Sequence, residues 1–171
     1  MSNINYKFEP THTSVMWCCS HFGFSSPKGQ FTMVEGDLSF NETNPASSSL
    51  NVTIGINNLS TGIDKFNEHL KSKDFFNCEE YPTVTFRSTK VTMLDNINAK
   101  VEGDFTLLGV TKPIILTATI NLVGENPMTK NKSVGFSAKA EIKRSDFGMS
   151  AYLPGIGDIV KLKIEAEAFR L

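Results

Sequence analysis

Alternation of apolar and polar residues with a period of two dominates this chain and limits the folds open to it. Five segments show it clearly: residues 49–56, 83–91, 100–108, 134–143 and 160–168. Three further segments follow it less regularly: residues 15–24, 31–40 and 113–122. Each is expected to form a strand with one apolar and one solvated face. About eight such strands favour a closed barrel or a sandwich, so the sequence predicts an all-β fold.

One segment, residues 64–77, departs from this pattern. Four of its residues recur at helical spacing: Phe66, His69, Leu70 and Lys73. The spacing predicts a single helix, with Thr61 or Gly62 as its cap. Because Phe75 and Phe76 follow, the segment is expected to pack on one end of the barrel. It is either a plug that completes the core or a lid beside a cavity.

The composition limits the classes of function that this chain can have. The 171 residues suit one domain, and 13 Phe residues stand against one Trp and three Tyr, which suits a dry core or a dry cavity. The net charge is −1 and no run of Lys or Arg occurs, so a nucleic-acid surface is not expected. No nucleophile–base pair, phosphate-binding glycine loop or paired carboxylates stand out, which favours a binding protein over an enzyme.

The cysteines and the N-terminus indicate a compartment. Cys18, Cys19 and Cys78 form an odd set with two adjacent members, which is a poor disulfide framework. Adjacent residues of a strand point to opposite faces, so Cys18 and Cys19 are expected to be small core residues and not a redox pair. No apolar signal segment or membrane span is visible. We therefore expect a cytoplasmic protein, or a periplasmic one if a signal peptide has been removed.

Six blocks of sequence, in this order, resemble the YceI-like family. They are E-P-T-H-T-S-V-M-W (9–17), S-H-F-G-F-S-S-P-K-G-Q-F (20–31), S-T-G-I-D-K-F-N-E-H-L-K-S-K-D-F-F-N (60–77), Y-P-T-V-T-F-R-S-T (81–89), G-D-F-T-L-L-G-V-T-K-P (103–113) and K-R-S-D-F-G-M (143–149). The resemblance covers nearly the whole chain and implies one domain over residues 1–171. It implies a lipocalin-like, extended antiparallel β-barrel with one helix near an end. It also implies binding, transport or storage of a polyisoprenoid, an isoprenoid quinone or a similar lipid in a hydrophobic tunnel.

The chain departs from the family pattern in two places. Phe66-Asn67 stand where Arg-Asp often precede Glu-His-Leu, which removes a charged pair that could meet a ligand headgroup. Glu9-Pro10 replace Asp-Pro, a mild change.

Inward-facing side chains are the candidates for the tunnel wall, although such positions serve a solid core equally well. The predicted ligand-binding residues are Trp17, Phe22, Phe24, Phe31, Phe40, Phe86, Phe105, Phe136 and Met149. The predicted residues of the tunnel mouth or lid are His21, Phe66, His69, Phe75 and Phe76. No metal and no cofactor are expected, apart from a bound isoprenoid or quinone-like lipid.

Two other functions compete with the carrier. In the first, His21 or His69 carries protons in a quinone-linked redox enzyme or a metal-dependent one. His12 and His21 fall on opposite faces of one strand, so a site that needs all three histidines is disfavoured. In the second, the barrel holds no ligand and is a stress-related interaction module, with a homodimer formed through barrel edges as an open alternative.

The D-F-G at residues 146–148 lacks a kinase context. It is expected to be a turn closed by an Arg144–Asp146 pair, with Gly148 supplying a permissive backbone. Residues 152–157 follow as a loop, and a gate there is a further hypothesis.

Overall fold

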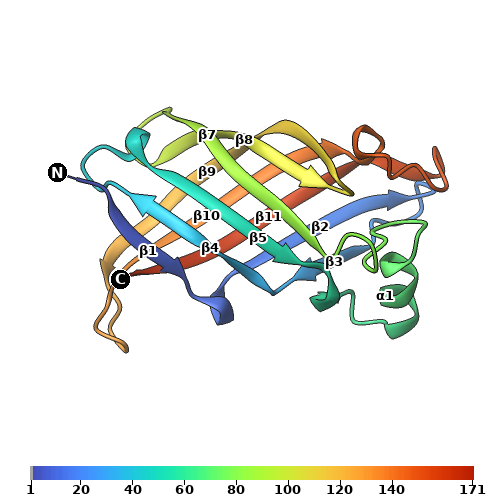
Figure 1. The fold of residues 1–171 in the computed structure, drawn as a ribbon, viewed down its shortest axis with the longest axis horizontal. Helices are drawn as coiled ribbons and strands as arrows, with labels where there is room; N and C mark the ends of the chain where they lie inside the picture. Colours follow the sequence, from blue (N-terminus) through green and yellow to red (C-terminus); the bar gives the residue numbers. More distant parts are fainter. Residues whose placement is uncertain (1) are drawn as a thin grey trace.

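A closed antiparallel β-barrel makes up most of the computed structural model, which describes residues 2–171. Eight strands close the barrel in the order β1 (Ile4–Phe8), β4 (Val34–Phe40), β5 (Ser49–Gly55), β7 (Thr83–Met93), β8 (Asn98–Leu107), β9 (Val110–Glu125), β10 (Lys132–Lys143) and β11 (Ile156–Arg170), with β11 pairing back to β1. The all-β barrel predicted from the alternation is confirmed. Figure 1 shows the barrel as elongated, with both termini at one end and helix α1 at the other.

Three short strands extend the barrel at the helix end. They are β2 (Ser14–His21), β3 (Lys28–Phe31) and β6 (Leu59–Ser60), and they pair in that order beyond β11. β1 and β2 lie end to end along the same edge of β11, separated by a 3-10 turn at Pro10–His12. Thr13 fills this break, because its hydroxyl donates to the Glu167 carbonyl and accepts from the Glu167 amide, both at 3.3 Å. Hydrogen bonding to β11 therefore continues across the gap between β1 and β2.

Each of the five clearly alternating segments lies in a strand, with ends that differ by up to four residues from the predicted ones, whereas two of the less regular segments were predicted wrongly. Residues 15–24 do not continue as a strand beyond His21, because Phe22 adopts a left-handed turn with φ 51°. Residues 31–40 divide into β3 and β4, which pair with different partners. Strand β1 was not predicted, although Tyr6 and Phe8 are buried in its inward face.

Helix α1 (Asp64–Lys71) is shorter than the predicted helix over residues 64–77. Its N-cap is Ile63 and not Thr61 or Gly62, so that prediction was wrong. Thr61 instead anchors the helix entrance, because its backbone amide and hydroxyl both donate to the Asn67 side-chain oxygen, at 2.8 and 2.7 Å. Turns follow the helix and carry Phe75 and Phe76 toward the barrel. Within residues 2–171, no helix is long and apolar enough to cross a bilayer.

The inward face of the barrel is apolar along its whole length, but its side chains are buried to different extents. Phe86, Phe105 and Val101 are buried. Leu162 and Ile164 on β11 remain only half-buried although they face inward. A densely packed interior would cover every inward side chain. Partial exposure inside a barrel indicates space there.

Candidate functional site

Two adjoining cavities occupy the interior of the barrel. The helix-side cavity has a volume of about 120 Å³, and the terminus-side cavity one of about 160 Å³. Both walls include the same four residues, which we call the waist: Val15, Ile54, Phe105 and Leu162. The two cavities, which together we call the hollow, therefore lie on either side of the waist and occupy the length of the barrel interior. Either part is far larger than the roughly 15 Å³ that one water molecule needs.

Small residues on the inner face of three neighbouring strands create the space in the terminus-side cavity. Ala99, Ala118 and Ala138 face one another across β8, β9 and β10. All three belong to the wall of that cavity. A methyl group cannot reach the barrel axis, so the opposite strands are left without contact at this level. Alanine at these inward positions therefore leaves the space that forms the cavity.

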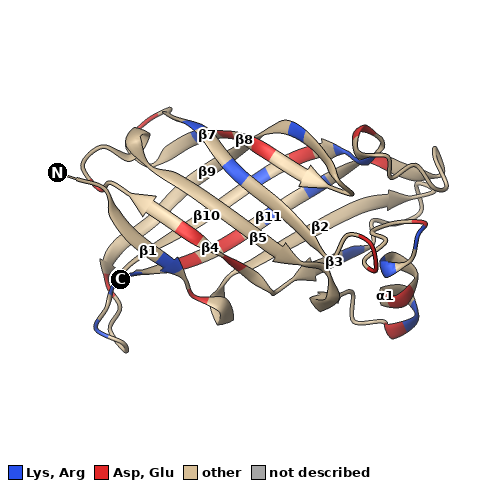
Figure 2. Cartoon of the chain, viewed as in Figure 1, with Lys and Arg blue, Asp and Glu red and all other residues tan. Residues whose placement is uncertain are grey.

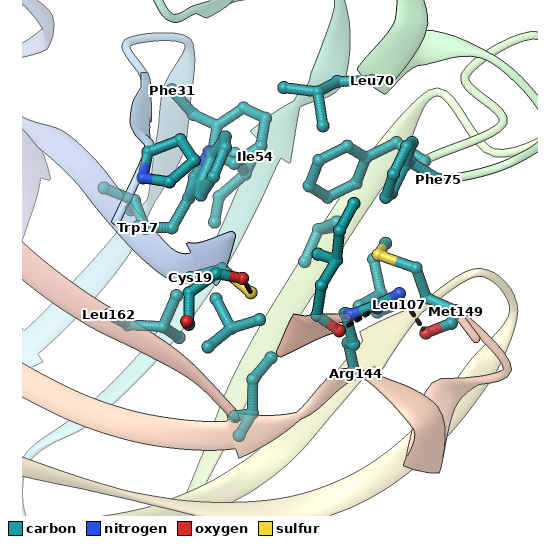
Figure 3. A pocket seen from close by; sticks show the side chains of 18 of the residues that line it. Trp17, Cys19, Phe31, Ile54, Leu70, Phe75, Leu107, Arg144, Met149 and Leu162 are labelled. Carbon is teal, nitrogen blue, oxygen red and sulfur yellow. Dashed lines mark hydrogen bonds between the residues drawn. The ribbon is translucent and has the colours of Figure 1, made fainter. Parts of the chain in front are cut away.

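Aromatic rings line the helix-side cavity. Trp17 of β2 lies flat against the barrel wall because its cross-strand partner is Gly29, where a Cβ atom would come within 2.6 Å of the indole. Phe66 of α1 packs edge-on against Trp17, with ring centroids 6.5 Å apart. Phe76 packs in the same way on Phe31, at 5.4 Å. The helix segment therefore closes this end of the hollow with apolar side chains, as Figure 3 shows for Phe75 and Leu70.

The helix-side cavity reaches the molecular surface at the end of β2. Ser20 and His21 are the exposed members of its wall, whereas every described residue of the terminus-side wall is buried or half-buried. We call Ser20 and His21 the mouth. Apart from these two, polar groups of the helix-side wall are found on Cys19 and Arg144, which both bond backbone carbonyls, and on Trp17, whose buried Nε1–H has no hydrogen-bond partner among residues 2–171. A ligand inside the barrel would meet an apolar surface.

Arg144 holds together the loop that borders the helix-side cavity. Its side chain is 2% exposed, and it donates to the carbonyl oxygens of Met149, Ala151, Ile156 and Gly157 at 2.8–2.9 Å (Figure 3). The predicted Arg144–Asp146 pair was wrong, because these carbonyls take the guanidinium donors instead. Gly148 has φ 81°, as its predicted role in the turn requires. The loop is fixed from within by one buried cation.

Asp158 braces the same loop from outside. It accepts bonds from the Ser145 hydroxyl at 2.6 Å and from the Ser145 backbone amide at 2.9 Å. The Ser145 hydroxyl and then its amide, with Arg144 nearby, lower the pKa of Asp158 against a smaller opposing effect of burial. The ionised carboxylate is therefore the form that stabilises the loop.

This arrangement predicts a pH-dependent contribution to stability. A carboxyl whose pKa is lower in the folded protein stabilises it fully above the unfolded-state pKa, about 4, and loses this contribution as the pH falls through the folded-state pKa. We expect Asp158→Asn to unfold at lower urea concentration than the unmodified protein at pH 7, and the two curves to converge near pH 3. Ser145→Ala should reduce the same pH dependence. Parallel curves at all pH values would contradict this role of Asp158.

The structure places most predicted site residues in the cavity walls. Trp17, Phe31 and Met149 line the helix-side cavity, Phe40, Phe86 and Phe136 line the terminus-side cavity, and Phe105 lines both. Of the predicted mouth or lid residues, His21, Phe66, Phe75 and Phe76 also belong to the helix-side wall. Whether these residues hold a ligand stays a prediction.

Three predicted residues lie outside both walls. Phe22 and Phe24 are 55% and 91% exposed in the β2–β3 loop, because the strand that would have turned them inward ends at His21. His69 lies behind the wall residue Phe75: its Nε2 lies 3.1 Å from Asp74 Oδ2, and its ring packs edge-on against Phe75 and Tyr152. These positions correct the prediction that Phe22 and Phe24 line the tunnel, whereas the role of His69 at the mouth or lid stays a prediction.

Sequence reasoning missed the small residues of the wall. It selected large aromatic side chains and passed over Ala99, Ala118 and Ala138, which leave the room. Ala138 was visible as an inward position of the alternating segment 134–143, and its small size was the usable signal. Leu162 and Ile164 were equally visible on the inward face of the last strand.

The histidines and cysteines are dispersed. His12 bonds Glu9 at 2.7 Å on the surface and belongs to neither cavity wall, whereas Cys19 and His21 belong to the helix-side wall. Among residues 2–171, no three His, Cys, Asp or Glu side chains gather in a way that could hold a metal ion. Burial raises the pKa of the Cys19 thiol, with Arg144 acting in the opposite direction. A protonated thiol is a weak nucleophile.

The family model, the sequence relatives and the solved structures that match this chain all indicate the same family. The model of the YceI-like domain matches residues 6–168. A UPF0312 protein of Photorhabdus laumondii is 38% identical over 97% of this chain and 86% of its own length, and Protein YceI of Escherichia coli is 37% identical over 95% and 85%. The crystal structure of the Campylobacter jejuni YceI protein is 33% identical, covers 88% of each chain and superposes with a TM-score of 0.79.

More distant structures share the fold. BcnA of Burkholderia cenocepacia has a TM-score of 0.84 at 20% identity, covering 94% of this chain and 98% of its own. A domain of Saccharophagus degradans, described as polyisoprenoid binding and implicated in plant cell wall breakdown, has a TM-score of 0.74 at 15% identity, covering 98% and 99%.

Proposed function

The chain belongs to the YceI-like family, and on that premise we propose that it binds a long apolar amphiphile inside the barrel, for transport or storage and without chemical change. The ligand class is a polyisoprenoid, an isoprenoid quinone or a lipid of similar shape. One structural neighbour, the Saccharophagus degradans domain, is described as binding a polyisoprenoid.

The observation that carries this proposal is the apolar hollow on both sides of the waist. Unfilled interior volume costs roughly 24 cal/mol per Å³ in lost packing, so each cavity would cost on the order of 3 kcal/mol if it stayed empty. A hydrocarbon tail recovers this energy. Each buried methylene contributes about 0.8 kcal/mol, so a few five-carbon units suffice for tight binding without a polar anchor.

The wall chemistry also supports a position for the ligand's polar end. Because the walls are almost wholly apolar and Trp17 Nε1–H is the one buried side-chain donor among residues 2–171 left without a partner, a headgroup inside the hollow would lose most of its hydrogen bonds to water. The headgroup is therefore expected at the mouth, beside Ser20 and His21, with the tail running past the waist.

Extraction tests this function directly. Protein purified without detergent and extracted with organic solvent is expected to release an apolar molecule in near-stoichiometric amount, identified by mass spectrometry. After extraction, a quinone with a saturated ten-carbon chain should quench the fluorescence of Trp17, the sole tryptophan, which lies in the helix-side wall. Saturation is expected near one quinone per protein. Clean extracts combined with no quenching would reject the carrier function.

A further inference from the structure

Two loops meet beside the mouth and form a surface without formal charge. They are residues 22–27, which connect β2 to β3, and residues 147–155, the second part of the connection from β10 to β11; neither contains Lys, Arg, Asp or Glu, and the exposed Asp146 and buried Arg144 precede the second segment. Elsewhere charged residues recur along the strands, around α1 and at the start of the β10–β11 connection, whereas the outermost parts of the loops beside the end of β2 are tan in Figure 2. We call the outer part of this surface, residues 22–26 and 150–155, the tip.

Hydrogen bonds join the two loops into one structure. The Phe22 amide donates to the Gly155 carbonyl at 2.7 Å, and the Phe22 ring lies directly over Gly155, where a Cβ atom would come within 2.2 Å of it. The Phe24 amide donates to the His21 carbonyl at 3.0 Å. Tyr152 connects the tip to the segment after α1, because its hydroxyl donates to Asp74 at 3.1 Å. The tip is thus a fixed feature and adjoins the mouth.

Large apolar rings project from this surface into solvent. Phe24 is 91% exposed, Phe22 55% and Tyr152 51%. A single exposed apolar side chain is common, as Met128 shows at 91% exposure in the β9–β10 turn. Met128, however, is followed by Lys130 and Lys132, whereas the tip gathers three rings within an uncharged surface. Such clusters mark a contact site.

We propose that the tip docks on the surface of a phospholipid bilayer and inserts Phe24 and Phe22 among the headgroups. This inference rests on the proposed carrier function and adds where the ligand enters. Phenylalanine and tyrosine favour the membrane interface, and the absence of charge avoids the cost of carrying ions toward hydrocarbon. Docking would bring the mouth against the bilayer, so a long apolar ligand could pass between membrane and barrel without crossing water.

Vesicle binding tests this proposal with a matched pair of variants. Phe24→Asp and Met128→Asp each place a carboxylate at a position that is 91% exposed, and the β9–β10 turn lies at the opposite end of the barrel (Figure 1). On phosphatidylcholine vesicles, extracted Phe24→Asp protein is expected to bind about tenfold more weakly than the unmodified protein. Met128→Asp should bind normally. Equal binding by both variants, or no binding by the unmodified protein, would overturn the proposal.

Two further measurements separate docking from its alternatives. A tryptophan introduced by Phe24→Trp should shift its emission to the blue on vesicle addition, whereas Met128→Trp should not.

Loading with the ten-carbon quinone diluted from ethanol should be the same in Phe24→Asp and unmodified protein, while uptake from vesicles slows about tenfold. Loss of loading from both sources in every protein would reject the carrier function itself. Sedimentation showing a dimer that Phe24→Asp dissociates, without vesicle binding, would make the tip a self-association surface and end the membrane proposal.

Discussion

Replacing Arg144 by methionine is expected to lower the free energy of unfolding by about 3–5 kcal/mol. The substitution keeps an unbranched apolar chain but leaves four carbonyl oxygens without their donor, and each unsatisfied buried acceptor costs about 1–3 kcal/mol. Removal of a buried charge returns part of this cost, so the effects do not simply add. Urea unfolding at pH 7, followed by far-UV circular dichroism, measures the difference.

Two companion variants separate the geometry of the guanidinium from its charge. Arg144→Lys retains the charge, but an ammonium on a flexible chain cannot bond carbonyls spread over residues 149–157 as the planar fork does. We expect it to recover less than half of the lost stability. Lys143→Met removes the neighbouring exposed cation and should change the unfolding free energy by less than about 0.5 kcal/mol. If Arg144→Met unfolds within 1 kcal/mol of the unmodified protein, the loop does not depend on this residue.

The barrel could be predicted because its cause is local and repeated along the chain. Alternation at residues 49–56 and 160–168 places every second side chain inward, and strands β5 and β11 do face the core in that way. The loops could not be predicted in the same manner. Phe24 belongs to a segment that reads as a strand, yet the turn at Phe22 turns the chain away from the barrel. Such a turn depends on contact with Gly155, which is distant in sequence.

The site was predictable only in part, for a related reason. Aromatic residues such as Trp17 and Phe105 were assigned to the tunnel because they are large and apolar, and they do lie in its wall. Empty space, however, arises where several small side chains face one another across strands. Ala118 and Ala138 become neighbours only through the register of β9 and β10, which the alternation does not specify. The residues that fill a wall are therefore easier to predict than those that leave it open.

Filling the terminus-side cavity is expected to weaken the binding of long ligands by at least about tenfold without destabilising the fold. Ala138→Phe would project a ring from β10 into the space between Ala118 and Ile164, its cross-strand neighbours. In a densely packed interior such an enlargement costs about 1–3 kcal/mol or more. In a hollow the ring gains contacts instead, so the unfolding free energy should stay the same or rise by about 1 kcal/mol.

The length of the ligand's prenyl tail gives this prediction a more specific test, because Ala138 lines the terminus-side cavity and not the helix-side one. A quinone with several prenyl units must pass the waist, and its affinity for Ala138→Phe should fall by at least about tenfold, as judged by quenching of Trp17. A quinone with one prenyl unit fits in the helix-side cavity and should bind as before. Lys139→Phe carries the same ring on the outer face of β10 and serves as the control. Loss of stability with unchanged long-chain binding would mean that the terminus-side space is not the ligand's path, whereas selective loss of long ligands would map the tail to the region beyond the waist.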